Sequence, residues 1–144
     1  MKKLFAAVLA VTMIAGPAIA KNNAVTITLR SVLDMPEAQA KLEGVKFYLA
    51  GAKTPKVTKK FGSDNSNART NAFNKTPEEA CRWNALTALI KFKEHALRDG
   101  ANAVVDIVSI REHEEFKSAT DLECSDGTFA AGITLKGTYA TVGK

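Results

Sequence analysis

The chain has 144 residues, of which 46% are hydrophobic and 24% charged, and its formal net charge is +5. This length is typical of one domain with a single core, and the charge balance is only mildly basic. After residue 20 no stretch is long and apolar enough to span a membrane, which excludes a helical membrane protein.

Residues 1–20 have the pattern of a Sec-type signal peptide. Lys2 and Lys3 precede an apolar run, residues 4–14, and small residues end the segment at Ala20. The run is too short to cross a hydrocarbon core of about 30 Å. We expect cleavage after Ala20, which leaves one domain over residues 21–144. The first cysteine is Cys81, so a lipid anchor has no attachment point. The mature chain is expected to be soluble, and periplasmic or secreted.

Short strands are predicted in the first half of the mature chain. In residues 24–30, Val25, Ile27 and Leu29 alternate with polar residues, and residues 45–49 alternate in the same way. The link between them is a turn with about one helical turn over residues 36–42. Residues 56–61 read as a basic edge strand, since lysines protect strand edges. Residues 62–71 show no apolar periodicity, which predicts a surface loop.

A long helix is predicted from Pro77 to Asp99. Thr76 is the N-cap, proline follows at the first helical position, and Gly100 ends the helix. One apolar stripe consists of Trp83, Leu86, Ile90 and Leu97. A second consists of Cys81, Ala85, Ala88, Leu89, Phe92 and Ala96. The exposed arc consists of Asn84, Thr87, Lys91, Glu94, His95 and Arg98. His95 is therefore expected to be a solvated surface histidine.

Residues 103–110 are apolar on nearly both faces, which predicts a central strand. Residues 112–126 read as an acidic loop. The last strand presents an inner face of Phe129, Ala131, Ile133, Leu135 and Tyr139. This order predicts an α+β fold in which one long helix packs on a mainly antiparallel sheet of four to five strands, in two layers.

The two cysteines, Cys81 and Cys124, are expected to pair, because exported proteins fold in an oxidising compartment. The bridge closes a loop of about 44 residues, for which chain entropy gives roughly 4 kcal/mol of stabilisation. The alternative is two free thiols. Cys81 at a helix N-terminus would then have part of the environment that a redox thiol needs.

Residues 45–139 resemble a group of small exported bacterial proteins often labelled "excinuclease ATPase subunit". The resemblance rests on the segments 44–48, 70–75, 78–81 and 100–105, and on Glu123-Cys124. The helix followed by residues 100–105 also resembles, more distantly, the Rcs envelope-stress sensor lipoprotein and related heavy-metal-binding domains. That sensor carries a lipid and two disulfides, and this chain has neither a lipid site nor four cysteines. The resemblance therefore implies a fold and an envelope location but no signalling partner.

Charge is segregated along the sequence. Eight basic residues and two acids lie between Lys41 and Lys75, whereas six acids and two bases lie between Arg111 and Asp126. The lysines of the first region form a candidate anion-binding surface: Lys53, Lys56, Lys59 and Lys60. Outside the cytoplasm its targets would be lipopolysaccharide phosphate, anionic lipid or peptidoglycan carboxylate. The alternative is an ordinary solubilising surface.

Motifs for metal binding and catalysis are weak or lacking. Glu112, His113, Glu114 and Glu115 are candidate metal ligands, but no second histidine follows at metal spacing, and a solvated loop is the alternative. Residues 132–138 lack the lysine that a P-loop needs after its second glycine, and no G-x-S-x-G elbow occurs.

We expect the protein to have no catalytic activity, to bind no cofactor and to bind no nucleic acid. The sequence favours a non-catalytic binding or envelope-sensing module that contacts an anionic envelope component or an envelope protein. The alternative is a metal-binding or thiol-redox protein.

Overall fold

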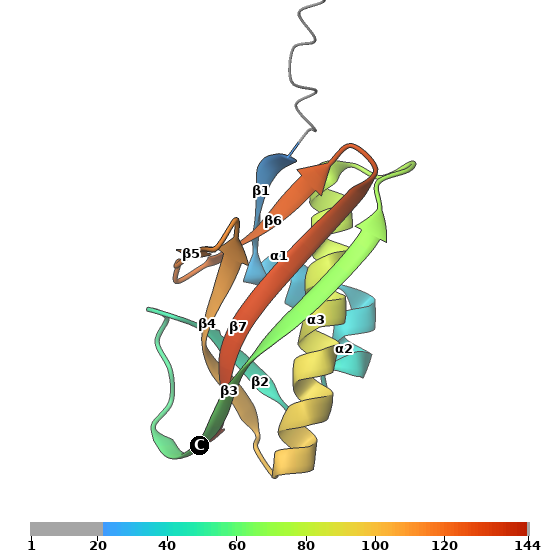
Figure 1. Ribbon diagram of the computed structural model, residues 1–144. Coiled ribbons are helices and arrows are strands. Elements are labelled where there is room, and N and C mark those ends of the chain that lie inside the picture. The colour runs from blue at the N-terminus through green and yellow to red at the C-terminus, as the bar shows by residue number, and fades with distance from the viewer. Residues whose placement is uncertain (1–21, 144) are drawn as a thin grey trace, which may run out of the picture.

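The computed structural model describes residues 22–143, so the predicted signal peptide lies outside the described residues. The described part contains seven strands and three helices (Figure 1). The strands are β1 (Asn22–Thr28), β2 (Lys46–Leu49), β3 (Val57–Asn71), β4 (Ala103–Arg111), β5 (Glu114–Phe116), β6 (Asp121–Gly127) and β7 (Ala130–Val142). The helices are α1 (Leu29–Leu33), α2 (Pro36–Lys41) and α3 (Pro77–Asp99). No described helix is long and apolar enough to cross a bilayer.

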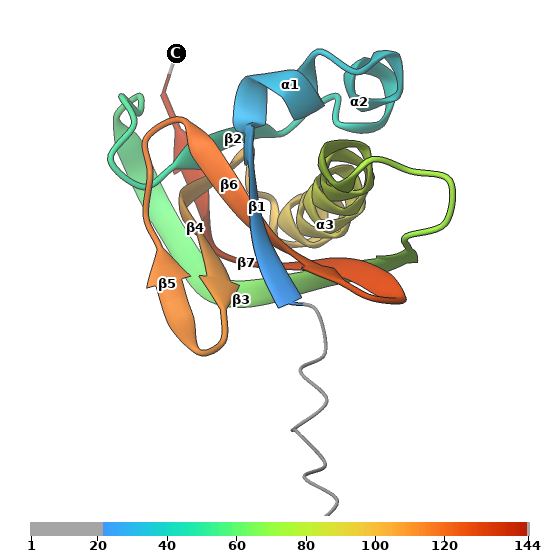
Figure 2. The same ribbon diagram turned by 90° about the horizontal axis from the view of Figure 1, so that it is seen from above.

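All seven strands belong to one mixed sheet. Its path is β1-β6-β7-β4-β2, with β3 added to β7 and β5 added to β4. The β2–β4 pair is parallel and the other pairs are antiparallel. The sheet curls into a half-barrel around α3, and α1 and α2 lie beside the same helix (Figure 2). The predicted α+β class is confirmed, and most strand pairs are antiparallel as expected, but the prediction of a plain sheet of four to five strands is wrong, because the sheet is mixed, curled and seven-stranded.

Two segments predicted as loops are strands. Residues 62–71 form the second part of β3, which pairs with β7 without interruption from Ser63 opposite Thr138 to Asn71 opposite Ala130. Only Ser66 and Ala68 are buried in this part, so the sequence lacks the usual apolar alternation. As predicted from residues 56–61, β3 lies at an edge, since β7 is its one partner in the described sheet.

The acidic segment also contains two strands, β5 and β6. Glu112 and His113 have φ of 52° and 66°, and they form the two-residue turn of the β4–β5 hairpin. In β6 the residues that point inward are Leu122, Cys124 and Asp126. The prediction of a loop over 112–126 is wrong because acids dominate the outward positions and mask this alternation.

Helix α3 begins and ends as predicted. The Thr76 hydroxyl accepts a hydrogen bond from the Glu79 amide at 3.1 Å, and Gly100 adopts a left-handed conformation with φ of 78°. The second predicted stripe is fully buried. Trp83 and Leu97 of the first stripe are 37% and 52% exposed, however, and Asn84 of the predicted exposed arc is only 2% exposed. The buried arc of the helix therefore differs from the predicted one.

The core lies between α3 and the inner face of the sheet. Its largest fully buried side chains include Phe92, Leu86, Leu89, Ile107, Leu122 and Leu135.

At the N-terminal side β1 ends at Thr28, whose hydroxyl caps α1, so Leu29 starts a helix instead of extending the predicted strand. Phe129, predicted on the inner face, lies in the turn between β6 and β7 and is 76% exposed.

Candidate functional site

The sheet divides at one edge of β7. Strand β6 pairs with β7 at Ala131 and Gly132, and β4 pairs with it from Leu135 onward. Where the two strands separate, the buried Ser109 hydroxyl accepts a hydrogen bond from the Glu123 amide at 2.9 Å. This side chain therefore links β4 to β6 across the fork, where backbone pairing is lost.

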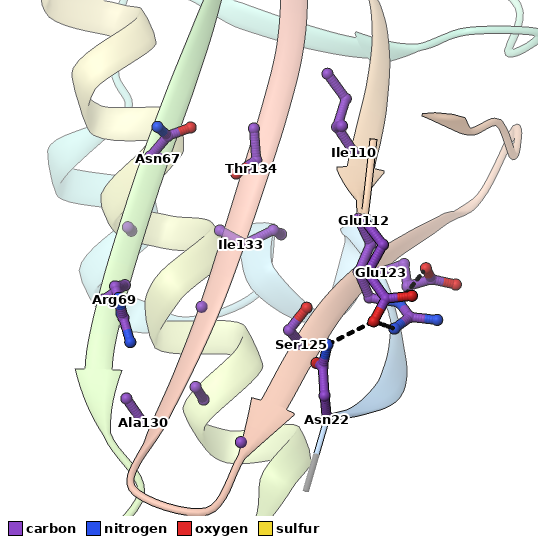
Figure 3. Close-up of a pocket in the computed structure, with 15 residues that line it drawn as sticks. Asn22, Asn67, Arg69, Ile110, Glu112, Glu123, Ser125, Ala130, Ile133 and Thr134 are labelled. Atoms are coloured by element: carbon purple, nitrogen blue, oxygen red, sulfur yellow. Dashed lines mark hydrogen bonds and ion pairs between the residues drawn. The ribbon is translucent and has the colours of Figure 1, made fainter. Parts of the chain in front are cut away.

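A hollow of about 400 Å³ lies over this fork, on the face of the sheet turned away from α3 (Figure 3). We call it the outer-face hollow. Residues with small side chains contribute to its lining: Gly127, Ala130, Ala131 and Gly132. Polar side chains project around it, Asn67 and Arg69 from β3, Thr134 from β7, Ser125 and Glu123 from β6, and Asn22 from β1. Its volume is at the small end of the range for ligand sites, about 300–1,000 Å³.

The charges on the two sides of the hollow differ. Arg111 Nε lies 2.9 Å from Glu123 Oε1, and Arg111 Nη1 lies 3.6 Å from Glu112 Oε1. The Asn22 amide donates to the same Glu112 oxygen at 2.6 Å. The Arg69 side chain, on the other side, makes no hydrogen bond or ion pair with any residue among 22–143, although its backbone pairs with β7 opposite Gly132. Arg111 and the two glutamates together carry one negative charge, so Arg69 places an unpaired positive charge on the opposite side of the hollow.

This arrangement can recognise a ligand by hydrogen bonds and charge. A guanidinium binds carboxylate or phosphate with two parallel donors, and the amides and hydroxyls around it can both donate and accept. Arg69 was not among the residues singled out in the sequence, because it lies in the segment predicted to be a surface loop. The sequence alone does not show that Arg69 pairs with Gly132 in the β3–β7 ladder, and this pairing places Arg69 beside the hollow.

Two of the four predicted anion-binding lysines lie on opposite faces of the sheet. Lys59 and Lys60 are successive residues of β3, so their side chains point to opposite faces. The Lys59 ammonium lies 4.8 Å from the centre of the Phe61 ring, and Lys60 lies 3.9 Å from an Asp106 carboxylate oxygen. Lys53 and Lys56 lie in the exposed segment before β3. Lys59 and Lys60 are thus on opposite sides of the edge strand β3.

The candidate metal ligands are also dispersed. Glu112 contacts Arg111 and Asn22, whereas Glu115 lies 3.6 Å from the Lys136 ammonium. His113 is exposed at the hairpin turn. In residues 22–143 no group of three or more histidine, cysteine, aspartate or glutamate side chains is close enough to hold a metal ion.

The disulfide between Cys81 and Cys124 is confirmed. It joins the first turn of α3 to β6, and the two residues are 0% and 1% exposed. The free-thiol alternative does not describe this structure, in which both described cysteines are bonded. Solvent reaches neither sulfur in the folded state.

His95 is half-buried in a polar cluster, contrary to the prediction of a solvated histidine. Its ring stacks on Tyr139 at a centroid distance of 4.2 Å, with one nitrogen 3.3 Å from Asp64 and the other 3.2 Å from Asp99. The Tyr139 hydroxyl donates to Asp64 at 3.4 Å. Burial, with the neighbouring carboxylate of Asp64, raises the pKa of Tyr139, which keeps the phenol protonated. The cluster ties α3 to β3 and β7.

The glycine pattern of residues 132–138 lies within β7 and forms no phosphate loop. Gly132 opens toward the outer-face hollow, whereas Gly137 faces Val104, Ile107 and Phe92 in the core.

Comparisons with protein families, curated proteins and solved structures found no match to the chain.

Proposed function

We propose that this protein is a non-catalytic binding or sensing module of the bacterial envelope, and that the outer-face hollow is its ligand site. The observation that carries the proposal is Arg69, a cation without a partner in the described residues, beside a hollow lined by amides and hydroxyls. A surface built only for solubility has no need to place small residues beneath such a group.

The chemistry of the hollow favours a ligand with one anionic group and several hydroxyl or amide groups. The anionic group binds Arg69, while hydroxyls or amides of the ligand meet Asn67, Ser125 and Thr134. Anionic components of the envelope, such as cell-wall glycopeptide, have this composition. The signal-peptide pattern and the buried disulfide support a periplasmic location, because disulfides persist in oxidising compartments.

The experiment is co-sedimentation of the mature protein with purified cell-wall sacculi and, separately, with anionic vesicles, at two salt concentrations. Binding is expected to weaken as salt rises, since exposed charges are screened within about 8 Å at physiological ionic strength. Arg69→Glu should abolish sedimentation. The triple variant Lys56→Glu/Lys59→Glu/Lys60→Glu, which changes the net charge more than Arg69→Glu does, should still sediment like the wild type.

The opposite pattern would move the binding surface to the lysines. Loss with the triple variant and full binding by Arg69→Glu would contradict the outer-face hollow as the site. Equal sedimentation of all three proteins would contradict both surfaces. Metal analysis of the purified protein tests the metal-binding alternative in the same preparation, and stoichiometric metal would support that alternative.

A further inference from the structure

A second, smaller hollow of about 290 Å³ lies between the end of β3 and the start of α3. Its lining residues are Arg69, Thr70, Lys75, Trp83, Asn84 and Thr87. We call it the Asn84 hollow. Arg69 is the one residue that also lines the outer-face hollow. The inference below concerns this other site and does not depend on the function proposed for the first.

Asn84 is the unusual residue of this site. Its side chain is 2% exposed, and its amide nitrogen has no hydrogen-bond partner among residues 22–143. Buried polar atoms nearly always have a partner, because an unmade hydrogen bond there costs the full desolvation of the donor. Because Asn84 also lines the hollow, this unpartnered donor is suited to an acceptor supplied by a ligand.

The charged residues that line the hollow are all basic. The Lys75 ammonium contacts only neutral oxygens in the described part of the chain, the Thr70 hydroxyl at 3.2 Å and the Asn71 carbonyl and side-chain oxygens at 3.3 and 3.5 Å. The lining residues include no carboxylate. A lysine without a carboxylate partner and an amide donor together favour an oxyanion.

Trp83 gives the hollow an aromatic wall. It is 37% exposed, although large aromatic side chains on a helix usually pack against the core. Ligand sites are typically lined by apolar and aromatic side chains with a few polar groups, and a volume just below the usual range suits a ligand of about one ring. The flat face of an aromatic ring can pack against the C–H groups of a sugar ring. The hydroxyls of Thr70 and Thr87 lie in the same lining.

We propose that the Asn84 hollow binds an acidic sugar unit, a single ring that carries a carboxylate or a phosphate. The oxyanion contacts Lys75 and the Asn84 amide nitrogen, and the ring lies against Trp83. A carboxylate and a phosphate would both bind a cation and an amide donor in this way. Titration with one sugar of each kind distinguishes between them.

Trp83 is the only tryptophan of the chain, so its fluorescence reports on the site directly. The mature protein is titrated with glucuronate, glucose 6-phosphate, glucose and inorganic phosphate. One or both acidic sugars should change the fluorescence saturably. Glucose and inorganic phosphate should bind at least tenfold more weakly, since each has only part of the recognised chemistry. Equal binding of glucose would overturn the role of the cation, and equal binding of inorganic phosphate would overturn the role of the ring.

Asn84→Leu separates recognition from folding. The substitution removes the unpartnered donor and keeps a similar volume, so the melting temperature should not fall, while acidic-sugar binding should weaken at least tenfold. Lys75→Gln should weaken binding, and the exposed Lys46→Gln is the matched control that should not. Wild-type affinity of Asn84→Leu would overturn the assignment. If that variant does not fold, the Asn84 side-chain amide resonance of the wild type decides: it should shift on titration, and a resonance that does not move would overturn the proposal.

Discussion

Removal of the Cys81–Cys124 bridge should destabilise the protein by an amount set mainly by the length of the loop that it closes. The two residues are separated by 43 positions, and the chain-entropy relation gives about 4 kcal/mol for a loop of that length. A domain of this size has a total stability of about 5–15 kcal/mol. Cys81→Ala or Cys124→Ala should therefore lower the melting temperature by roughly 15 °C.

The double variant distinguishes a cross-link from two separate packing contributions. Each single variant already loses the whole bridge, so the double variant should be only about 1 kcal/mol less stable, the cost of one more buried sulfur. Urea unfolding followed by Trp83 fluorescence measures all three. Losses that simply add, to about 8 kcal/mol in the double variant, would refute the reasoning, because they would mean that the two sulfurs stabilise the fold independently.

Three further predictions follow from single contacts. Thr76→Ala should lower the free energy of unfolding, measured in urea, by about 1 kcal/mol, because it removes the N-cap of α3. Thr76→Ser should keep most of this stabilisation, because serine also has a hydroxyl that can cap the helix. Gly137→Ala should cost about 1–3 kcal/mol, because its Cβ would lie 2.7 Å from a methyl carbon of Val104. Gly62→Ala is the control, because a Cβ at this position would have no atom within 4 Å. Its free energy of unfolding should stay within about 0.5 kcal/mol of the wild-type value. The protein should neither hydrolyse ATP nor show a thermal shift with ATP and magnesium, and a saturable shift abolished by Lys136→Ala would contradict this.

Local signals predicted some elements accurately. The cap at Thr76, the proline after it and the glycine at position 100 defined α3, because each acts within a few residues of the chain. The apolar run of β4 was recognised for the same reason, since most of its residues are buried. The pairing of Cys81 with Cys124 followed from the count of cysteines and the expected compartment.

The rest depends on partners that are distant in the sequence. The second half of β3 is a strand only because β7 pairs with it, and its own side chains are mostly polar and exposed. The curl of the sheet buries Asn84, which helical periodicity placed on the exposed arc. Arg69 could not be recognised as a site residue, because its position over the hollow depends on the β3–β7 register and on the fork between β4 and β6.

The most direct test of the outer-face hollow is to fill it. Thr134 lines the hollow, and Thr138 lies four residues along the same strand on the same face but outside it. Thr134→Trp and Thr138→Trp are compared with the wild type by co-sedimentation with cell-wall sacculi, after circular dichroism has shown that both fold. We expect Thr134→Trp to remain in the supernatant and Thr138→Trp to sediment with the sacculi. Sedimentation of Thr134→Trp at the wild-type level would contradict the assignment of the ligand site to this hollow.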